Sequence, residues 1–182
     1  MKEISWPLWT MEMTPSSVTS DSYPIEVGVA CWTAPTSAIM LWSSAINPYG
    51  VAGWEETDHE FLERIGFDES RLRQGVPPVV IARNLNDIFM SSTVYGKGGT
   101  TDIHLANRLN FTARVWPTYE LKSWRVICER RPANGSSAWE IIRTAKGDAA
   151  DRARGTMMGI AHLLGQVPSS RRVATMAVAL PI

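Results

Sequence analysis

An apolar run close to the N-terminus constrains the fold of this chain more than any other stretch. Residues 4–12 read Ile-Ser-Trp-Pro-Leu-Trp-Thr-Met-Glu, so that apolar side chains fall on both faces of an extended segment and the run ends in a carboxylate, Glu12. A strand with two apolar faces is usually covered on both sides. We therefore predict a strand over 4–12 at the centre of a sheet, with Glu12 at its carboxyl end, where open α/β sheets gather their ligands.

The length and charge of the chain limit the classes of protein to which it can belong. Its 182 residues fit one domain with a sizeable core, and its formal net charge of zero gives no global basic field for nucleic acid or a membrane. Cys31 and Cys128 sit in apolar surroundings without the spacing of metal ligands, which indicates reduced thiols. The opening Met1-Lys2-Glu3 lacks the features of a signal peptide, and no apolar segment is long enough to span a membrane. We expect a cytoplasmic protein without membrane partners.

Hydrophobic periodicity predicts strands and helices that alternate after an initial group of strands. Beyond the run at 4–12 and a loop at 13–22, strands are predicted at 24–32, 38–43, 91–95 and 113–116. Helical spacing is found at 55–65, 68–72, 78–89, 102–109, 119–131, 137–142 and 148–164. This order, β-β-β-α-β-α-β-α, predicts an α/β domain over 1–165 with a five-stranded mixed sheet and helices on both faces. Residues 166–182 form a C-terminal tail.

Four short motifs fall on these elements. Thr10-Met11-Glu12 lies on the first strand and Ile25-Glu26-Val27-Gly28 on the second, Asp102 follows the strand at 91–95, and residues 143–149 (Arg-Thr-Ala-Lys-Gly-Asp-Ala) open the last long helix. In order and spacing, over roughly residues 4–165, they resemble the motifs of DEDDh 3′-5′ exonucleases of the proofreading-subunit and ribonuclease T type, which have a ribonuclease H-like fold. The family patterns are Asp-x-Glu, Ile-Glu-Ile/Val-Gly, a single Asp, and His-x-Ala-x-x-Asp-Ala.

The resemblance implies a set of site residues. Glu12, Asp102 and Asp148 match metal ligands for Mg²⁺ or Mn²⁺, and Thr14, Arg143 and Lys146 are the residues expected to contact nucleic acid. An alternative register would place Asp151 at the last acid and Lys146 at the histidine. Asp102 and Asp148 also follow the pattern of ordinary helix caps, and each reading stays open.

Two positions depart from the family pattern. Thr10 stands at the first aspartate, where a neutral hydroxyl should weaken a pair of divalent ions that clamps a phosphodiester. Arg143 stands at the general-base histidine, and an arginine stays protonated and cannot accept the proton of the attacking water. We hypothesise that Arg143 replaces part of the metal charge by pairing with Glu12, Asp102 or Asp148, or by gripping a phosphate.

Three functions follow from these expectations. The first is an exonuclease-fold protein with weakened or lost hydrolysis that still binds nucleic-acid 3′ ends, expected to be single-stranded, or a protein partner. The second is an active metal-dependent 3′-5′ exonuclease on single-stranded DNA or RNA. The third is an adaptor or inhibitor of a larger complex that uses an aromatic surface around Trp42, Trp54, Trp116 and Trp124. The choice between DNA and RNA and the oligomeric state, including the homodimer of some similar enzymes, are open at this point.

Overall fold

The order of strands and helices in the computed structural model is the order that the sequence predicts. The structure describes residues 6–54, 57–97, 100–129, 134–168 and 174–175. The strands are β1 (Leu8–Pro15), β2 (Pro24–Trp32), β3 (Ile39–Ala45), β4 (Thr93–Gly96), β5 (Glu120–Ser123) and a two-residue β6 (Ala174–Thr175). The helices are α1 (His59–Ile65), α2 (Ser70–Arg73), α3 (Pro78–Phe89), α4 (Thr100–Ala113), α5 (Arg125–Cys128), α6 (Gly135–Thr144) and α7 (Ala149–Leu163).

The sheet is mixed, and β1 lies inside it as predicted. Its strand order is β5-β4-β1-β2-β3-β6. β1, β2 and β3 are antiparallel neighbours, whereas β4 runs parallel to β1 and β5 runs parallel to β4. The predicted α/β class with five strands is therefore confirmed, with β6 added at the β3 edge, and the arrangement is compatible with a ribonuclease H-like fold.

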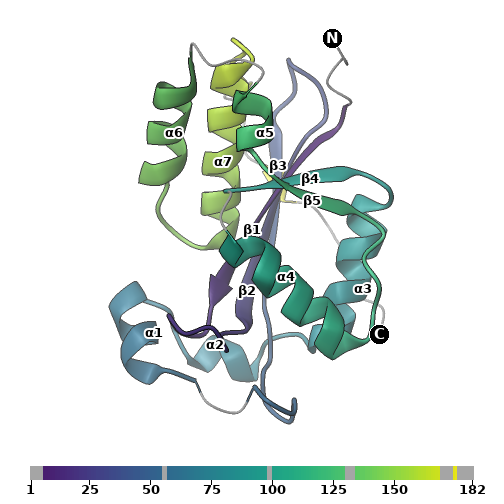
Figure 1. The fold of residues 1–182 in the computed structure, drawn as a ribbon, viewed down its shortest axis with the longest axis vertical. Helices are drawn as coiled ribbons and strands as arrows, with labels where there is room; N and C mark the ends of the chain where they lie inside the picture. The colour runs from purple at the N-terminus through teal and green to yellow at the C-terminus, as the bar shows by residue number, and fades with distance from the viewer. Residues whose placement is uncertain (1–5, 55–56, 98–99, 130–133, 169–173, 176–182) are drawn as a thin grey trace.

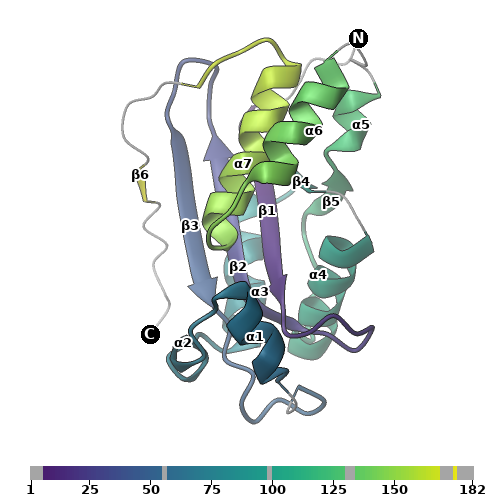
Figure 2. The ribbon, with the colours of Figure 1, turned by 90° about the vertical axis from the view of Figure 1, so that its left-hand side faces the viewer.

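Helices cover both faces of the sheet (Figure 1). α3 and α4 pack on one face through a core that includes Met11, Val27 and Leu85. α5, α6 and α7 pack on the other face through a second core that includes Trp32 and Met157. In the perpendicular view α7 runs over β1 and β2 (Figure 2), which makes it the helix that closes the site described below.

The first strand is longer at its carboxyl end than the sequence predicts. β1 runs to Pro15, so Glu12 lies inside the strand and the predicted loop begins later. The extension is held by antiparallel pairing, in which Thr14 lies opposite Glu26. Met13 is buried and adds to the core, so the extra residues gain both hydrogen bonds and apolar contacts.

The predicted fifth strand at 113–116 is wrong, as is a helix over the whole of 119–131. α4 continues to Ala113 and ends at Arg114, whose φ of 52° is left-handed. β5 follows at Glu120–Ser123 and, among the strands that the structure describes, pairs with β4 alone. Because this edge strand is mostly half-buried or exposed, its apolar pattern is too weak to distinguish it from a helix.

Gly28 sets how closely α7 approaches the sheet. A Cβ at this position would lie 2.0 Å from the carbonyl carbon of Ala149 and 2.1 Å from the nitrogen of Ala150. Only a residue without a side chain fits between β2 and the first turn of the helix. Gly28 is also the partner of Glu12 in the β1–β2 register, so the first turn of α7 packs on the strand next to the one that carries Glu12.

The tryptophans divide between the core and the surface. Trp42, Trp54 and Trp124 are buried, and only Trp116 of the predicted aromatic surface is exposed, at 90 %. These four residues therefore do not form one surface. Cys31 and Cys128 are free thiols, and burial raises the pKa of Cys31 to about 12. Within the described ranges, every helix is too short or too polar to cross a bilayer.

Candidate functional site

Polar side chains gather on the α7 face of β1. Side chains alternate along a strand, so that Met11 and Met13 enter the core on one face while Thr10, Glu12 and Thr14 lie on the other. All three polar residues are buried. Since buried polar groups need partners, each contact of these residues indicates what the site is built to hold.

Glu12 is the central residue of this group. Its Oε1 accepts a hydrogen bond of 2.7 Å from the hydroxyl of Thr156 on α7. Burial and the negative charge of Asp102 raise the pKa of Glu12 to about 7, against the lowering effects of the Thr156 hydrogen bond and of Lys97 and Arg152. Glu12 and Asp102 are thus close enough to repel each other, and two cations stand near them.

Asp102 lies in the first turn of α4 and reaches the end of β4. A Cβ at Gly96 would lie 3.2 Å from its Oδ2 and 3.5 Å from the backbone oxygen of Met11. The carboxylate is therefore wedged beside β1, next to the residue before Glu12. The structure brings together two of the three predicted acids, Glu12 and Asp102.

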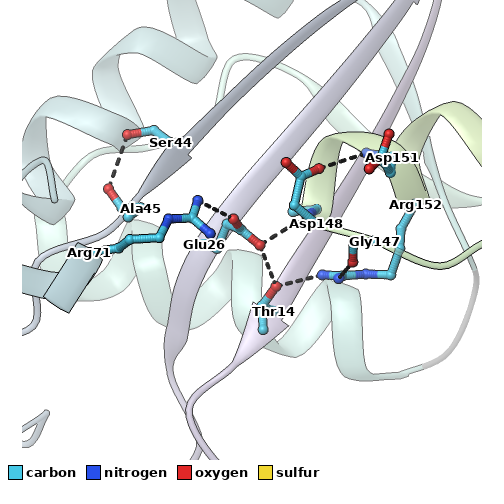
Figure 3. Close-up of polar contacts among 10 residues, drawn as sticks. Thr14, Glu26, Ser44, Ala45, Arg71, Gly147, Asp148, Asp151 and Arg152 are labelled. Carbon is cyan, nitrogen blue, oxygen red and sulfur yellow. Dashed lines mark hydrogen bonds and ion pairs between the residues drawn. The ribbon is translucent and has the colours of Figure 1, made fainter. Parts of the chain in front are cut away.

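Asp148 has a different position. It is the N-cap of α7, and its Oδ1 accepts a hydrogen bond of 2.9 Å from the backbone nitrogen of Asp151. Its carboxylate is exposed and, in Figure 3, is directed toward Asp151. Of the two interpretations of Asp148 that the sequence left open, the structure shows the helix cap. An Asp at this position accepts a hydrogen bond from a free N–H of the first helical turn.

The hydroxyl of Thr10 is hydrogen-bonded to the backbone of α7. Thr10 is fully buried, and its hydroxyl donates a hydrogen bond of 2.7 Å to the carbonyl oxygen of Ala153. The proton of the hydroxyl thus serves to attach β1 to the helix. A residue with this role stands where the resemblance expects the first aspartate.

A chain of polar contacts crosses the sheet beside Glu12 (Figure 3). Arg152 donates to the carbonyl of Gly147 at 2.8 Å and to the hydroxyl of Thr14, and that hydroxyl donates to Glu26 Oε2 at 3.0 Å. Glu26 also accepts from the backbone nitrogen of Ala149 at 3.0 Å and pairs with Arg71 at 2.6 Å. The chain fixes the start of α7 to β1 and β2.

Thr14, predicted to contact nucleic acid, is an internal member of this chain. It is 4 % exposed, and its hydroxyl is used by Glu26 and Arg152. In the structure its contacts are within the protein. The two other predicted contact residues, Arg143 and Lys146, are exposed near the turn between α6 and α7. Arg152 holds that turn beside Thr14 through the Gly147 carbonyl.

Arg143 does not have the ion pairs that we hypothesised. Its guanidinium pairs with Glu140, three residues earlier on α6, at 2.7 Å and 3.2 Å, and this pairing raises its pKa. Arg152 and Lys97 are the cations close enough to lower the pKa of Glu12. The cations that act on Glu12 are therefore these two residues and not Arg143.

The donor set is poor for the two metal ions that the resemblance implies. Among the residues that the structure describes, no group of three or more His, Cys, Asp or Glu side chains is placed to hold a metal ion. Glu12 and Asp102 supply two carboxylates, Thr10 is occupied, and Lys97 and Arg152 oppose a divalent cation. A two-ion centre does not fit these residues.

A pocket of about 530 Å³ lies at the start of α4, where Thr101 and His104, on either side of Asp102 in the sequence, belong to its lining. Hydroxyl groups and an imidazole line one part of it, and Phe61, Leu105 and Val18 line another. The polar lining residues are Ser17, Thr19, Ser20, Ser22, Thr101 and His104. Such a mixture of hydroxyls and apolar groups suits a small ligand with one flat face and several hydrogen-bonding atoms.

Sequence reasoning missed Arg152, Thr156 and Lys97. Arg152 and Thr156 are four residues apart and lie four and eight residues after Asp148, so all three share one face of α7. That spacing was the available signal. Lys97 belongs to a glycine-rich stretch of the sequence, Gly96-Lys97-Gly98-Gly99, which gives no indication of where the lysine side chain lies. Comparison with protein-family models and with curated proteins found no match for the chain.

Proposed function

We propose that this chain is a DEDDh-type exonuclease-fold protein that binds nucleic-acid 3′ ends and has weakened or lost phosphodiester hydrolysis. The proposal combines the sequence motifs with the sheet order, in which β1 carries Glu12 at the centre. In a second form of this proposal, the chain binds a protein partner and not nucleic acid.

One observation carries the loss of hydrolysis. Glu12 and Asp102 are accompanied by two cations of the protein itself, Lys97 and Arg152. These positive charges offset burial and the charge of Asp102 only in part, since the pKa of Glu12 stays raised to about 7, but they oppose the entry of a divalent ion. A centre of this kind can hold a phosphate near its cations, but it lacks the ions that would activate water and stabilise the leaving oxygen.

Retained binding is supported by a pocket beside α4, the helix that carries Asp102. Its volume of about 530 Å³ suits a terminal nucleoside, and hydroxyls of the segment 17–22 offer polar partners. Lys146 adds exposed positive charge at the turn between α6 and α7, where Arg143 is paired with Glu140. Phosphates attract such side chains without regard to sequence.

The test compares binding and hydrolysis with the same oligonucleotides. We expect fluorescence anisotropy to detect binding of a single strand with a free 3′ hydroxyl, and weaker binding when that end carries a phosphate. With Mn²⁺ and a 5′-labelled strand, we expect little or no stepwise shortening. Absence of binding to DNA and RNA strands would refute the nucleic-acid form of the proposal, and a pull-down would then test the protein-partner form.

An active enzyme is the alternative, favoured by the closeness of Glu12 and Asp102. It predicts a ladder of shortened products that requires Mg²⁺ or Mn²⁺ and disappears in Glu12→Gln. Titration calorimetry separates the two cases, because two tight sites for Mn²⁺ in the wild-type protein would contradict the weakened centre.

A further inference from the structure

The outer face of α4 carries exposed apolar side chains that no described part of the chain covers. Phe111 is 86 % exposed near its carboxyl end, and Trp116, in the loop that follows, is 90 % exposed. Ile103 is also exposed at the other end of the helix. Phe111 and Trp116 are five residues apart in the sequence. Exposed aromatic side chains so close together are unusual in a domain whose other large apolar side chains are mostly buried.

Trp116 is held on a fixed loop. Asn86 on α3 donates from its side chain to the backbone oxygen of Trp116 at 2.8 Å and accepts from the backbone nitrogen of Thr118 at 2.9 Å. The loop therefore presents the indole from a fixed backbone. Stacking of a flat ligand on the ring would therefore cost little backbone conformational entropy.

The charged side chains that flank these rings in the sequence are positive. Between residues 103 and 118 they are Arg108 and Arg114, and this stretch contains no acid. Arg108 donates to the backbone oxygen of Gly53 at 3.3 Å. On neighbouring α3, Asp87 lies four residues after Arg83, and the two offset each other. The face suits a polyanion with flat groups.

The same face leads to the pocket. His104 lines the pocket, and Phe111 lies seven residues further along α4, a rise of about 10 Å. About three stacked nucleotides cover that distance. A strand whose 3′ nucleoside occupied the pocket would therefore bring its next bases to Phe111 and Trp116.

We propose that Phe111 and Trp116 form a stacking platform for the unpaired bases upstream of the bound 3′ end, with Arg108 and Arg114 attracting the phosphates. This inference rests on the proposed function and extends it from the terminal nucleoside to the following nucleotides. A second copy of the chain is a poorer occupant, because a two-fold contact would bring the arginines of both copies together.

The experiment measures the affinity of the full chain for thymidylates of two lengths by anisotropy, in EDTA to prevent hydrolysis. Wild type should bind the octamer more tightly than the dimer. Trp116→Ala and Phe111→Ala should each weaken octamer binding at least about fivefold and leave dimer binding unchanged. Trp116→Phe should retain most of the affinity. Val167→Ala, which removes an equally exposed apolar side chain elsewhere, should have no effect.

Two results overturn the inference, and they differ from each other. If wild type binds the octamer and both alanine variants bind it equally well, the platform is refuted and the proposed function stands. If wild type binds neither oligonucleotide, the platform and the nucleic-acid form of the proposed function fail together. Sedimentation of the same proteins adds a third observation: variants that lose self-association but keep octamer affinity would assign the surface to a second copy and refute the platform.

Discussion

Thr156 donates its hydroxyl proton to Glu12 across 2.7 Å between α7 and β1, at a point where neither side chain is more than 3 % exposed. The bond favours the charged carboxylate, yet burial and Asp102 outweigh it and raise the pKa of Glu12 to about 7. The group therefore changes charge in the range of ordinary buffers, and the stability of the protein should report it.

Glu12→Gln should remove a pH dependence of stability. In the folded protein the pKa of Glu12 is about 7, against an ordinary value of 4.5, so the folded state binds the proton more tightly than the unfolded state. The free energy of unfolding should therefore fall as the pH rises from about 4.5 to about 7, by about 3 kcal/mol, and stay low above that range.

Glutamine keeps an acceptor for Thr156 and carries no charge, so the variant should exceed wild type in stability near pH 8 and lose this slope. Urea unfolding at about pH 5 and about pH 8 measures both effects. Parallel pH profiles for the two proteins would contradict the assignment of the slope to Glu12.

Glu26→Gln should destabilise the protein more than Arg71→Gln. Glu26 is buried and accepts from three donors, so an amide would turn one NH₂ group toward a donor and leave buried groups unpaired, at a cost of about 1–3 kcal/mol. Arg71 is 40 % exposed, and water can compensate for its loss in part. Thermal unfolding of both variants checks the order, and equal losses would mean that the ion pair itself dominates.

Gly28→Ala should cost more than about 3 kcal/mol, because the new methyl group would overlap the backbone of Ala149 and separate α7 from the sheet. Gly50→Ala is the matched control. Gly50 has a φ of 75° but no atom within 4 Å of an added Cβ, so it should lose only about 1–2 kcal/mol from backbone strain. A similar loss in both variants would show that α7 moves away from β2 without difficulty.

Thr10→Asp should destabilise the protein in the absence of metal. Aspartate cannot donate to the Ala153 carbonyl as Thr10 does, and it would add a buried negative charge near Glu12. Thr10→Asn can still donate and should be milder. Unfolding of the two variants in EDTA tests the difference, and an aspartate variant as stable as the asparagine variant would contradict it.

Thr156→Asp should create a metal-dependent gain of stability. The new carboxylate would stand beside Glu12 and Asp102 and complete a group of three acids. We expect lower stability than wild type in EDTA and recovery with Mn²⁺, by about 3 kcal/mol at one hundred times the dissociation constant. The conservative Thr156→Asn should gain nothing from the metal, so an equal response of both variants would exclude a site at this position.

Much of the fold could be predicted because strong local patterns coincide with burial. The double-sided apolar run gave a central strand, and the repeat from Ala150 to Leu164 gave α7 almost to its ends. β5 was missed because an edge strand with few buried side chains lacks a period. β1 was cut short because Met13-Thr14-Pro15 looks like a turn until its pairing with β2 is known.

The site was only partly predictable for a different reason. The resemblance to the exonuclease motifs pointed to Glu12 and Asp102, which lie on separate elements that the fold brings together. The sequence could not show that the carboxylate of Asp148 caps α7. Nor could it show that Arg152, and not Arg143, lies near Glu12. The direction of a side chain at the start of a helix depends on how the helix packs on the sheet. For α7 this packing depends on Gly28.

The contact of Gly28 with the backbone of Ala149 also limits where the structure around Glu12 can open to a larger ligand. Because backbone lies against backbone at Gly28, no side chain at that point can rearrange to make room. We therefore expect a ligand larger than the present pocket to displace the side chains that line it on α4 and on the segment 17–22, among them His104 and Val18.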